Sequence, residues 1–221
     1  CIAINVCRMI VTKNWLFLVL FLSLLTSCSN DEAAITDLFQ NYKSALVAKD
    51  YSVLCSSLDN KSIQLFKDLA RFARLADSLE LSKTPIFVRY EVLLLRQQLI
   101  REELLDLNWE DVCKIGTDKI VLNENLYNSQ LGVNKIKDNQ AVYYLVINGK
   151  QTENALYFRK EESGWKLNAA KYYAMMSRMS YVEGIANGNK ALQNQRLEQK
   201  VAFQADAPLK PYIWLPPSEW E

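Results

Sequence analysis

The sequence predicts a helix-rich α+β protein, and three observations support that class. From about residue 31 to about residue 116, apolar side chains recur at the spacing of helices. Beyond residue 129 the apolar period falls to two, which is typical of strands. Asn148-Gly149 separates two β-rich runs and is a strong hairpin signal. We therefore expect helices first and an antiparallel sheet after them.

The helices are expected to begin soon after residue 30. Residues 31–49 carry one apolar face, which predicts a helix lying on a core. Asp50 is a suitable N-cap for a short second helix. Residues 62–80 show a wide apolar arc, which predicts a helix that is covered on most sides.

Two further helix starts follow. Thr84-Pro85 combines a capping hydroxyl with a proline at the first helical position, which predicts a helix running to about Leu107. Asn108 and Asp111 have the spacing of a cap for one more turn, which Gly116 is expected to end.

The strands come next and are short. Leu131 and Val133 alternate along the first, residues 141–147 form the second, and residues 153–160 form its hairpin partner. A turn through Gly164 then leads into a last strand at residues 165–168. From about residue 170 the pattern turns helical again, and residues 206–221, with four prolines, predict an extended tail.

The first 27 residues have the layout of an export signal. Arg8 and Lys13 precede an apolar run that is short for a membrane span. It ends in Leu25-Thr26-Ser27-Cys28, which resembles a bacterial lipobox. We expect residues 1–27 to be a signal peptide, with residues 1–8 lying upstream of the natural start at Met9. A retained membrane helix is the rival interpretation.

Cys28 is the expected lipidation site, and residues 28–32 are the expected lipidated tether. Acyl chains anchor a protein by inserting into the bilayer. The predicted localisation is therefore the cell envelope, at the outer membrane, on its periplasmic or surface-exposed face. The acidic opening after Cys28 resembles a surface-export signal, and Ser29 with Glu32 equally has the spacing of a helix capping box.

Composition excludes several functions. Without the first 27 residues the chain holds 24 basic and 25 acidic residues, so no nucleic-acid partner is expected. Histidine is absent, which excludes Ser-His-Asp and Cys-His nucleophile systems, histidine-ligated zinc and any histidine general base. No metal site and no cofactor are expected. The membrane, reached through the lipid, is the expected partner, together with a small ligand or an envelope protein.

Cys55 and Cys113 are the two further cysteines of the mature chain. In an oxidising envelope they can pair as a disulfide. Each also lies in an amphipathic helical pattern, where a buried free thiol is ordinary. Both alternatives stay open.

The hairpin at residues 158–167, a short acidic turn followed by Gly-Trp-Lys-Leu, carries a family resemblance. With the run at residues 141–147 and a helix ending near Asp50, it resembles the nuclear-transport-factor-2-like, or cystatin-like, superfamily. More narrowly, the chain is similar to bacterial lipoproteins of unknown function built on that domain. The resemblance implies a curved antiparallel sheet wrapped around N-terminal helices as a cone with a pocket.

The resemblance also implies a domain organisation. Residues 33–170 would form the cone-like α+β domain, with an extended helical insertion at residues 62–116. Residues 171–221 would add a C-terminal helix and a tail rich in proline and aromatic residues. The insertion and the C-terminal addition depart from the family pattern. Enzymes of the family often use a histidine–aspartate pair, which this chain lacks, so no catalytic residue is carried over.

Aromatic residues of the strands are the candidate pocket lining, since ligand sites are apolar with a few polar groups. They are Tyr143, Tyr144, Tyr157 and Trp165. The alternative is ordinary packing within and beneath the sheet. The expected function is a lipid-anchored, non-enzymatic binding or interaction module. A histidine-free hydratase or isomerase and a purely structural envelope protein are the alternatives.

Overall fold

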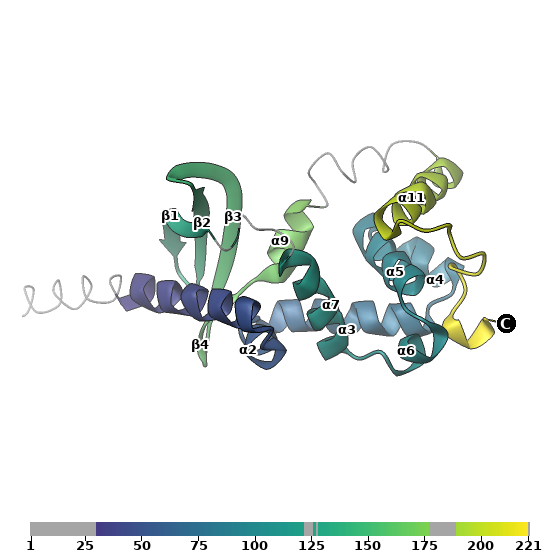
Figure 1. Ribbon diagram of the computed structural model, residues 1–221, viewed down its shortest axis with the longest axis horizontal. Helices are drawn as coiled ribbons and strands as arrows, with labels where there is room; N and C mark the ends of the chain where they lie inside the picture. Colours follow the sequence, from purple (N-terminus) through teal and green to yellow (C-terminus); the bar gives the residue numbers. More distant parts are fainter. Residues whose placement is uncertain (1–29, 122–125, 127, 177–188, 221) are drawn as a thin grey trace, which may run out of the picture.

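The computed structural model describes residues 30–121, 126, 128–176 and 189–220. The predicted signal peptide and the lipidation site Cys28 lie outside these residues. The α+β class is confirmed. The described chain is elongated, with the sheet at one end of the long axis and most helices at the other (Figure 1). Among the described residues, none of the helices combines the length and the hydropathy that crossing a bilayer requires.

The N-terminal helix, residues 30–48, lies across the sheet (Figure 1). Its apolar face buries Ile35, Phe39 and Leu46 completely or nearly so. Asp50 then caps helix α2 (Tyr51–Ser56) as predicted, because its carboxylate accepts a hydrogen bond from the Val53 amide at 3.1 Å. The helix therefore contributes one side of a core between itself and the sheet.

The sheet has four antiparallel strands in the order β1-β2-β3-β4 and is open. They are β1 (Ser129–Lys137), β2 (Gln140–Ile147), β3 (Lys150–Glu161) and β4 (Gly164–Leu167). The hairpin predicted at Asn148-Gly149 is confirmed, and both residues take the positive φ angles, 51° and 73°, that such a turn requires. Beside β4, Leu58 forms a parallel bridge to Leu167, which joins the sheet to the start of the helical region.

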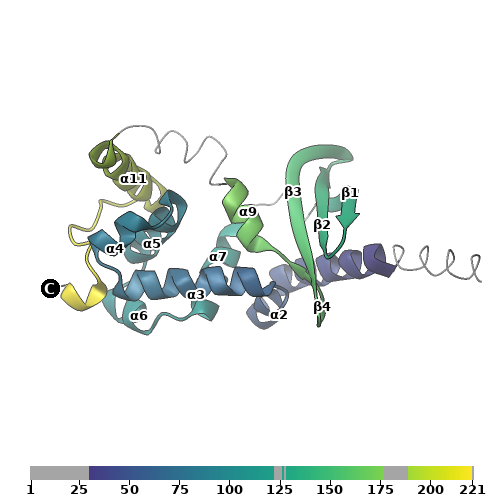
Figure 2. The same ribbon diagram turned by 180° about the vertical axis from the view of Figure 1, so that it is seen from behind.

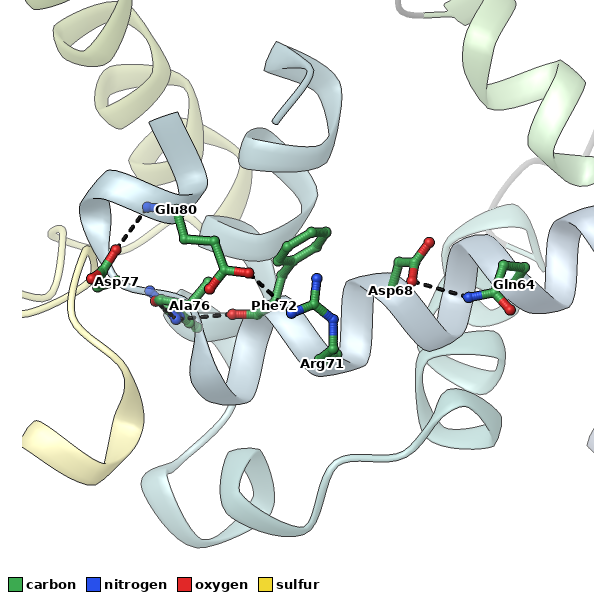
Figure 3. A network of polar contacts seen from close by, with 8 residues as sticks. Gln64, Asp68, Arg71, Phe72, Ala76, Asp77 and Glu80 are labelled. Carbon is green, nitrogen blue, oxygen red and sulfur yellow. Dashed lines mark hydrogen bonds and ion pairs between the residues drawn. The ribbon is translucent and has the colours of Figure 1, made fainter. Parts of the chain in front are cut away.

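The helical region breaks more often than the sequence predicts. Its elements are α3 (Asn60–Leu75), α4 (Ser78–Lys83), α5 (Ile86–Gln98), α6 (Arg101–Asp106) and α7 (Trp109–Val121). The single helix expected at residues 62–80 is wrong, because Asp77 caps a new helix, α4, and Arg71 of α3 bonds to Glu80 (Figure 3). The helix expected from Thr84 to Leu107 is likewise divided, at Leu99.

After the sheet the chain forms two further described helices, one in each region. Helix α9 (Ala169–Met176) follows β4, whereas α11 (Lys190–Ala205) packs on α5 at the far end (Figures 1 and 2). The tail, with the short 3-10 helix η1 (Pro217–Glu219), is not free. Ile213 and Trp220 are buried, and the Lys210 ammonium donates to the Leu99 carbonyl at 2.6 Å. The tail thus folds back onto its own helices.

A buried arginine fastens this end of the molecule. Arg96 of α5 is fully buried, and its guanidinium donates to carbonyls of the last turn of α3, Phe72, Ala73 and Ala76, at 2.6–3.0 Å. It also donates to the Ile213 carbonyl of the tail at 3.2 Å. The last carbonyls of a helix have no N–H donor within the helix, and the guanidinium supplies these donors. Its positive charge also interacts favourably with the negative end of the helix dipole.

Candidate functional site: a tyrosine-lined cavity

A cavity of about 270 Å³ lies between the sheet end and the helices. The N-terminal helix, β3 and α9 form most of its wall, and α3 and α7 contribute from the helical region. Its described apolar lining includes Leu38, Phe39, Leu58, Phe66, Leu145, Leu156 and Phe158. The volume is close to the lower limit, about 300 Å³, of ordinary small-molecule pockets.

Four tyrosines contribute to this lining. Tyr42 comes from the N-terminal helix, Tyr157 from β3, and Tyr172 and Tyr173 from α9. The Tyr173 ring lies edge-on to Phe66, with ring centroids 6.1 Å apart, and packs at 5.3 Å from Phe87. Aromatic neighbours thus hold this side chain in place.

The hydroxyls of Tyr42, Tyr172 and Tyr173 are protonated at neutral pH. Burial raises the pKa of Tyr42 to about 12 and also raises the pKa of Tyr172. The pKa of Tyr173 is raised as well, first by burial and then by Glu91, Tyr42 and Tyr172. Because a neutral phenol both donates and accepts hydrogen bonds, these groups suit an uncharged polar atom of a ligand.

Two asparagines add the remaining side-chain polar groups of the described lining. Asn154 lies on β3, and Asn168 lies between β4 and α9. The side-chain amide oxygen of Asn168, Oδ1, accepts from the backbone N–H of Lys171 at 2.8 Å, so Asn168 caps α9. No aspartate, glutamate, lysine or arginine is present among the described lining residues. The cavity is therefore apolar with neutral polar groups.

Helix α7 forms one wall through Cys113 and Gly116. Gly116 does not end this helix, contrary to the prediction, but lies inside it. A Cβ atom at Gly116 would lie 3.2 Å from the Tyr173 hydroxyl oxygen, so the glycine leaves room for that side chain. In the structure Cys113 is disulfide-bonded to Cys55 of α2, with Cα atoms 6.1 Å apart.

The four aromatic residues singled out in the sequence occupy three different environments. Tyr157 lines the cavity, and the Lys171 ammonium lies 4.7 Å from its ring centre. Tyr143 and Trp165 are buried in the core beneath the N-terminal helix, where the indole donates to Asp31 at 2.9 Å. Tyr144 is 40% exposed on β2. The structure therefore brings only Tyr157 of the four to the described wall of the cavity.

Sequence reasoning missed Tyr42, Tyr172 and Tyr173. Each fits the apolar periodicity of a helix, which predicts a side chain packed on a core and not one that lines a cavity. The adjacent pair Tyr172-Tyr173 is the signal that could have indicated a cavity wall. Neighbouring residues on a helix point about 100° apart, so they do not both enter one narrow core stripe.

The described residues contain no cluster of cysteine and acidic side chains that could hold a metal ion. No protein-family model, curated protein or solved structure matches this chain. Its function is therefore inferred from its own residues and their geometry.

Proposed function

We propose that this chain is a lipid-anchored cell-envelope protein whose cavity binds a small, uncharged, largely apolar ligand. The neutral cavity of about 270 Å³ is the observation that carries the proposal. A charged ligand would lose its hydration there without gaining an ionic partner from the described lining, which is costly. A neutral ligand with a carbonyl or hydroxyl group can bond to tyrosine or asparagine instead.

The anchoring part of the proposal rests on the lipobox-like segment ending at Cys28. This segment supports a location in the cell envelope, at the outer membrane, on the periplasmic or the surface-exposed face. Metabolic labelling with a fatty-acid probe should label the natural protein and fail in Cys28→Ala. A natural chain that never incorporates the probe would contradict the anchoring.

The cone-like fold of the nuclear-transport-factor-2-like superfamily is part of the same proposal. An N-terminal helix crossing an antiparallel sheet, with a cavity between the sheet and the helices, supports that relation. In this interpretation the helices of residues 62–116 and the C-terminal segment are additions to the cone, and α3, α7 and α9 contribute to the wall of its cavity.

The enzymatic alternative needs an acid beside a tyrosine in the cavity. The acids nearest the hairpins do not meet this need, since Asp138, Glu153 and Glu162 are exposed. Glu161 accepts a hydrogen bond from the Asn60 amide at 2.9 Å, which gives it a structural role at the start of α3. Glu91 of α5, whose charge raises the pKa of Tyr173, lies outside the described lining of the cavity. Binding is therefore the better-supported function.

A matched pair of probes tests the binding proposal. Naphthamide and naphthoate are similar in size, but only the second is charged. We expect naphthamide to raise the melting temperature and to bind in titration calorimetry, and naphthoate to do neither at the same concentration. Equal binding of both probes would contradict the neutral character of the site.

Variants locate that binding in the cavity. Tyr173→Phe removes one hydroxyl and keeps the ring, so affinity should fall about three- to tenfold, the usual loss for one hydrogen bond of about 0.5–1.5 kcal/mol. Tyr144→Phe is the matched control, because it removes an exposed hydroxyl outside the described cavity wall. If both variants bind naphthamide equally well, the ligand does not use the Tyr173 hydroxyl.

A further inference from the structure

The start of the N-terminal helix is bound to the sheet by its side chains. The Asp31 carboxylate accepts from the Lys160 ammonium at 2.7 Å and from the Trp165 indole at 2.9 Å. The neighbouring Glu32 carboxylate accepts from the side-chain Nδ2 of Asn134 on β1 at 3.2 Å. The first turn of the helix is thus held to β1 on one side and to β3 and β4 on the other.

These contacts limit how far the folded part can move from Cys28. Each residue spans at most about 3.6 Å, so the Cα atoms of Cys28 and Asn30 lie within about 7 Å whatever path the chain takes. A lipid headgroup layer is itself about 5–8 Å deep. An acylated Cys28 that inserts into the bilayer therefore brings the first turn, and the β1 strand bonded to it, to the headgroups.

Strand β1 is an edge strand that suits such a position. It lies nearest the start of the N-terminal helix at the end of the long axis in both views (Figures 1 and 2). Val133 is 66% exposed, and Lys135 and Lys137 are exposed on the same strand. Lysine and an aliphatic side chain suit a lipid interface, because the ammonium reaches phosphate while its stem stays on apolar surface.

Acidic groups lie close to the lysines. Glu32 and Asp138 are exposed near β1, so this end of the molecule is not strongly basic. Electrostatic attraction to anionic lipids is therefore weak, and the short tether is the main cause of the placement.

We propose that the β1 edge lies against the lipid headgroups and that the helical end projects away from the membrane. This orientation rests on the proposed lipid anchoring. Helix α11 and the described C-terminal end lie at the opposite end of the long axis (Figures 1 and 2). The membrane surface then covers the edge of β1 that no strand of the described residues pairs with, and which would otherwise be open to another strand.

Site-directed quenching tests the orientation in the lipidated protein that begins at Cys28. Val133→Cys on β1 and Phe203→Cys on α11 each replace an exposed apolar residue, 66% and 82% exposed, with a thiol for a fluorophore. Cys55 and Cys113 are buried in their disulfide, so the dye reacts with the introduced thiol. The vesicles contain phosphatidylethanolamine and phosphatidylglycerol with a nitroxide-labelled lipid.

We expect the nitroxide to quench the dye at position 133 and to leave the dye at position 203 unchanged. Flotation of the vesicles reports anchoring separately. A protein that floats with the vesicles but is quenched at neither position, or equally at both, overturns the orientation while the anchoring stands. A protein that does not float overturns both.

A longer tether tests whether the short tether is what holds β1 at the headgroups. Inserting about ten glycine and serine residues between Ser29 and Asn30 adds a flexible reach of roughly 15–20 Å. We expect the inserted protein to float as before and to lose the quenching at position 133. Persistent quenching would show that β1 binds lipid by itself, which overturns the tether as the cause. Loss of dye accessibility at position 133 without quenching would instead indicate a protein strand on this edge.

Discussion

The two ends of the molecule differ in how completely their interiors are filled. The helical end has one large apolar core shared by α3, α5, α7, α11 and the tail, and a buried arginine bonded to four carbonyls. The sheet end has two small clusters beneath the N-terminal helix and a cavity beside them. Unfilled volume costs packing energy. We therefore expect the helical end to contribute most of the stability, and the sheet end to provide space for a ligand.

Two of the links that join these ends make the comparison testable. The disulfide connects α2, beside the sheet, with α7 of the helical region. Asp59, the N-cap of α3, contacts Arg159 of β3. Changes inside the helical core should therefore cost the most stability, changes at the links less, and changes at the start of the N-terminal helix least.

Arg96→Met should have the largest effect. Methionine keeps much of the apolar stem but leaves the carbonyls of Phe72, Ala73, Ala76 and Ile213 without their buried donor. Burial lowers the pKa of Arg96 to about 10, so the side chain is still charged at neutral pH and opposes the end of α3. We expect unfolding in urea to show a loss of about 3–5 kcal/mol.

Arg71→Met is the matched control for that measurement. Arg71 pairs with Glu80 at 3.0 Å, but both side chains are nearly half exposed (Figure 3). An exposed ion pair contributes about 0.2–1 kcal/mol, so this variant should stay close to the natural protein. Equal losses of unfolding free energy in the two variants would show that the buried guanidinium contributes no more stability than an exposed one.

Removing the disulfide should have the next largest effect. The bond joins residues 58 positions apart, and closing a loop of that length stabilises a fold by about 2–4 kcal/mol. The variant that combines Cys55→Ala with Cys113→Ala should therefore unfold at lower urea concentration. The natural protein treated with reductant should shift in the same direction. If neither shifts, the two ends do not depend on this link.

Asp59→Ala tests the second link. Asp59 is fully buried, accepts from the amide and the hydroxyl of Ser62, and lies 3.2 Å from the Arg159 guanidinium. Alanine loses the cap and leaves a partly buried cation, so we expect a loss of about 2–3 kcal/mol in urea unfolding. Asp59→Asn keeps a capping oxygen and should lose less.

The exposed N-cap Asp50 provides the control for Asp59. Asp50→Ala removes an equivalent bond, to the Val53 amide, but no buried ion pair. Its loss should stay near 1 kcal/mol. If Asp50→Ala and Asp59→Ala cost the same, the contact with Arg159 contributes nothing to holding the ends together.

Local signals predicted the strands and several caps well. Asn148-Gly149 and Asp50 act through their own backbone neighbours, so a short stretch of sequence contains the whole cause. Helix breaks were predicted poorly. The Thr84 hydroxyl donates to the Leu81 carbonyl and ends α4, so the same residue that signalled a helix start closes the preceding helix.

The cavity could not be predicted from local patterns. Its wall combines residues of the N-terminal helix, β3, α7 and α9, and their meeting depends on the long-range packing of these elements. Gly116 illustrates the difficulty. A glycine late in a helical pattern indicates a C-cap, but here it gives space to the Tyr173 hydroxyl from a distant helix. The fold-back of the tail likewise depends on Arg96 and Lys210.

Asp31→Asn should change the free energy of unfolding least, and the change should depend on pH. Hydrogen bonds from Lys160 and Trp165, together with the Lys160 charge, lower the pKa of Asp31 from its ordinary value of 3.8. A carboxyl group with a lowered pKa in the folded state stabilises the fold above that ordinary value and loses its contribution as the pH falls through the lowered one. The pair is partly exposed, so the contribution should be below about 1 kcal/mol.

Asparagine keeps an oxygen for the Trp165 indole and removes the charge that attracts Lys160. The natural protein should therefore lose more stability than Asp31→Asn between neutral pH and strongly acidic pH, as measured by urea unfolding across that range. Asp37→Asn, which removes an exposed carboxylate from the same helix, is the matched control. If all three profiles coincide, the ion pair does not hold the first turn to the sheet. The proposed orientation on the membrane would then depend on Trp165 and Asn134 alone.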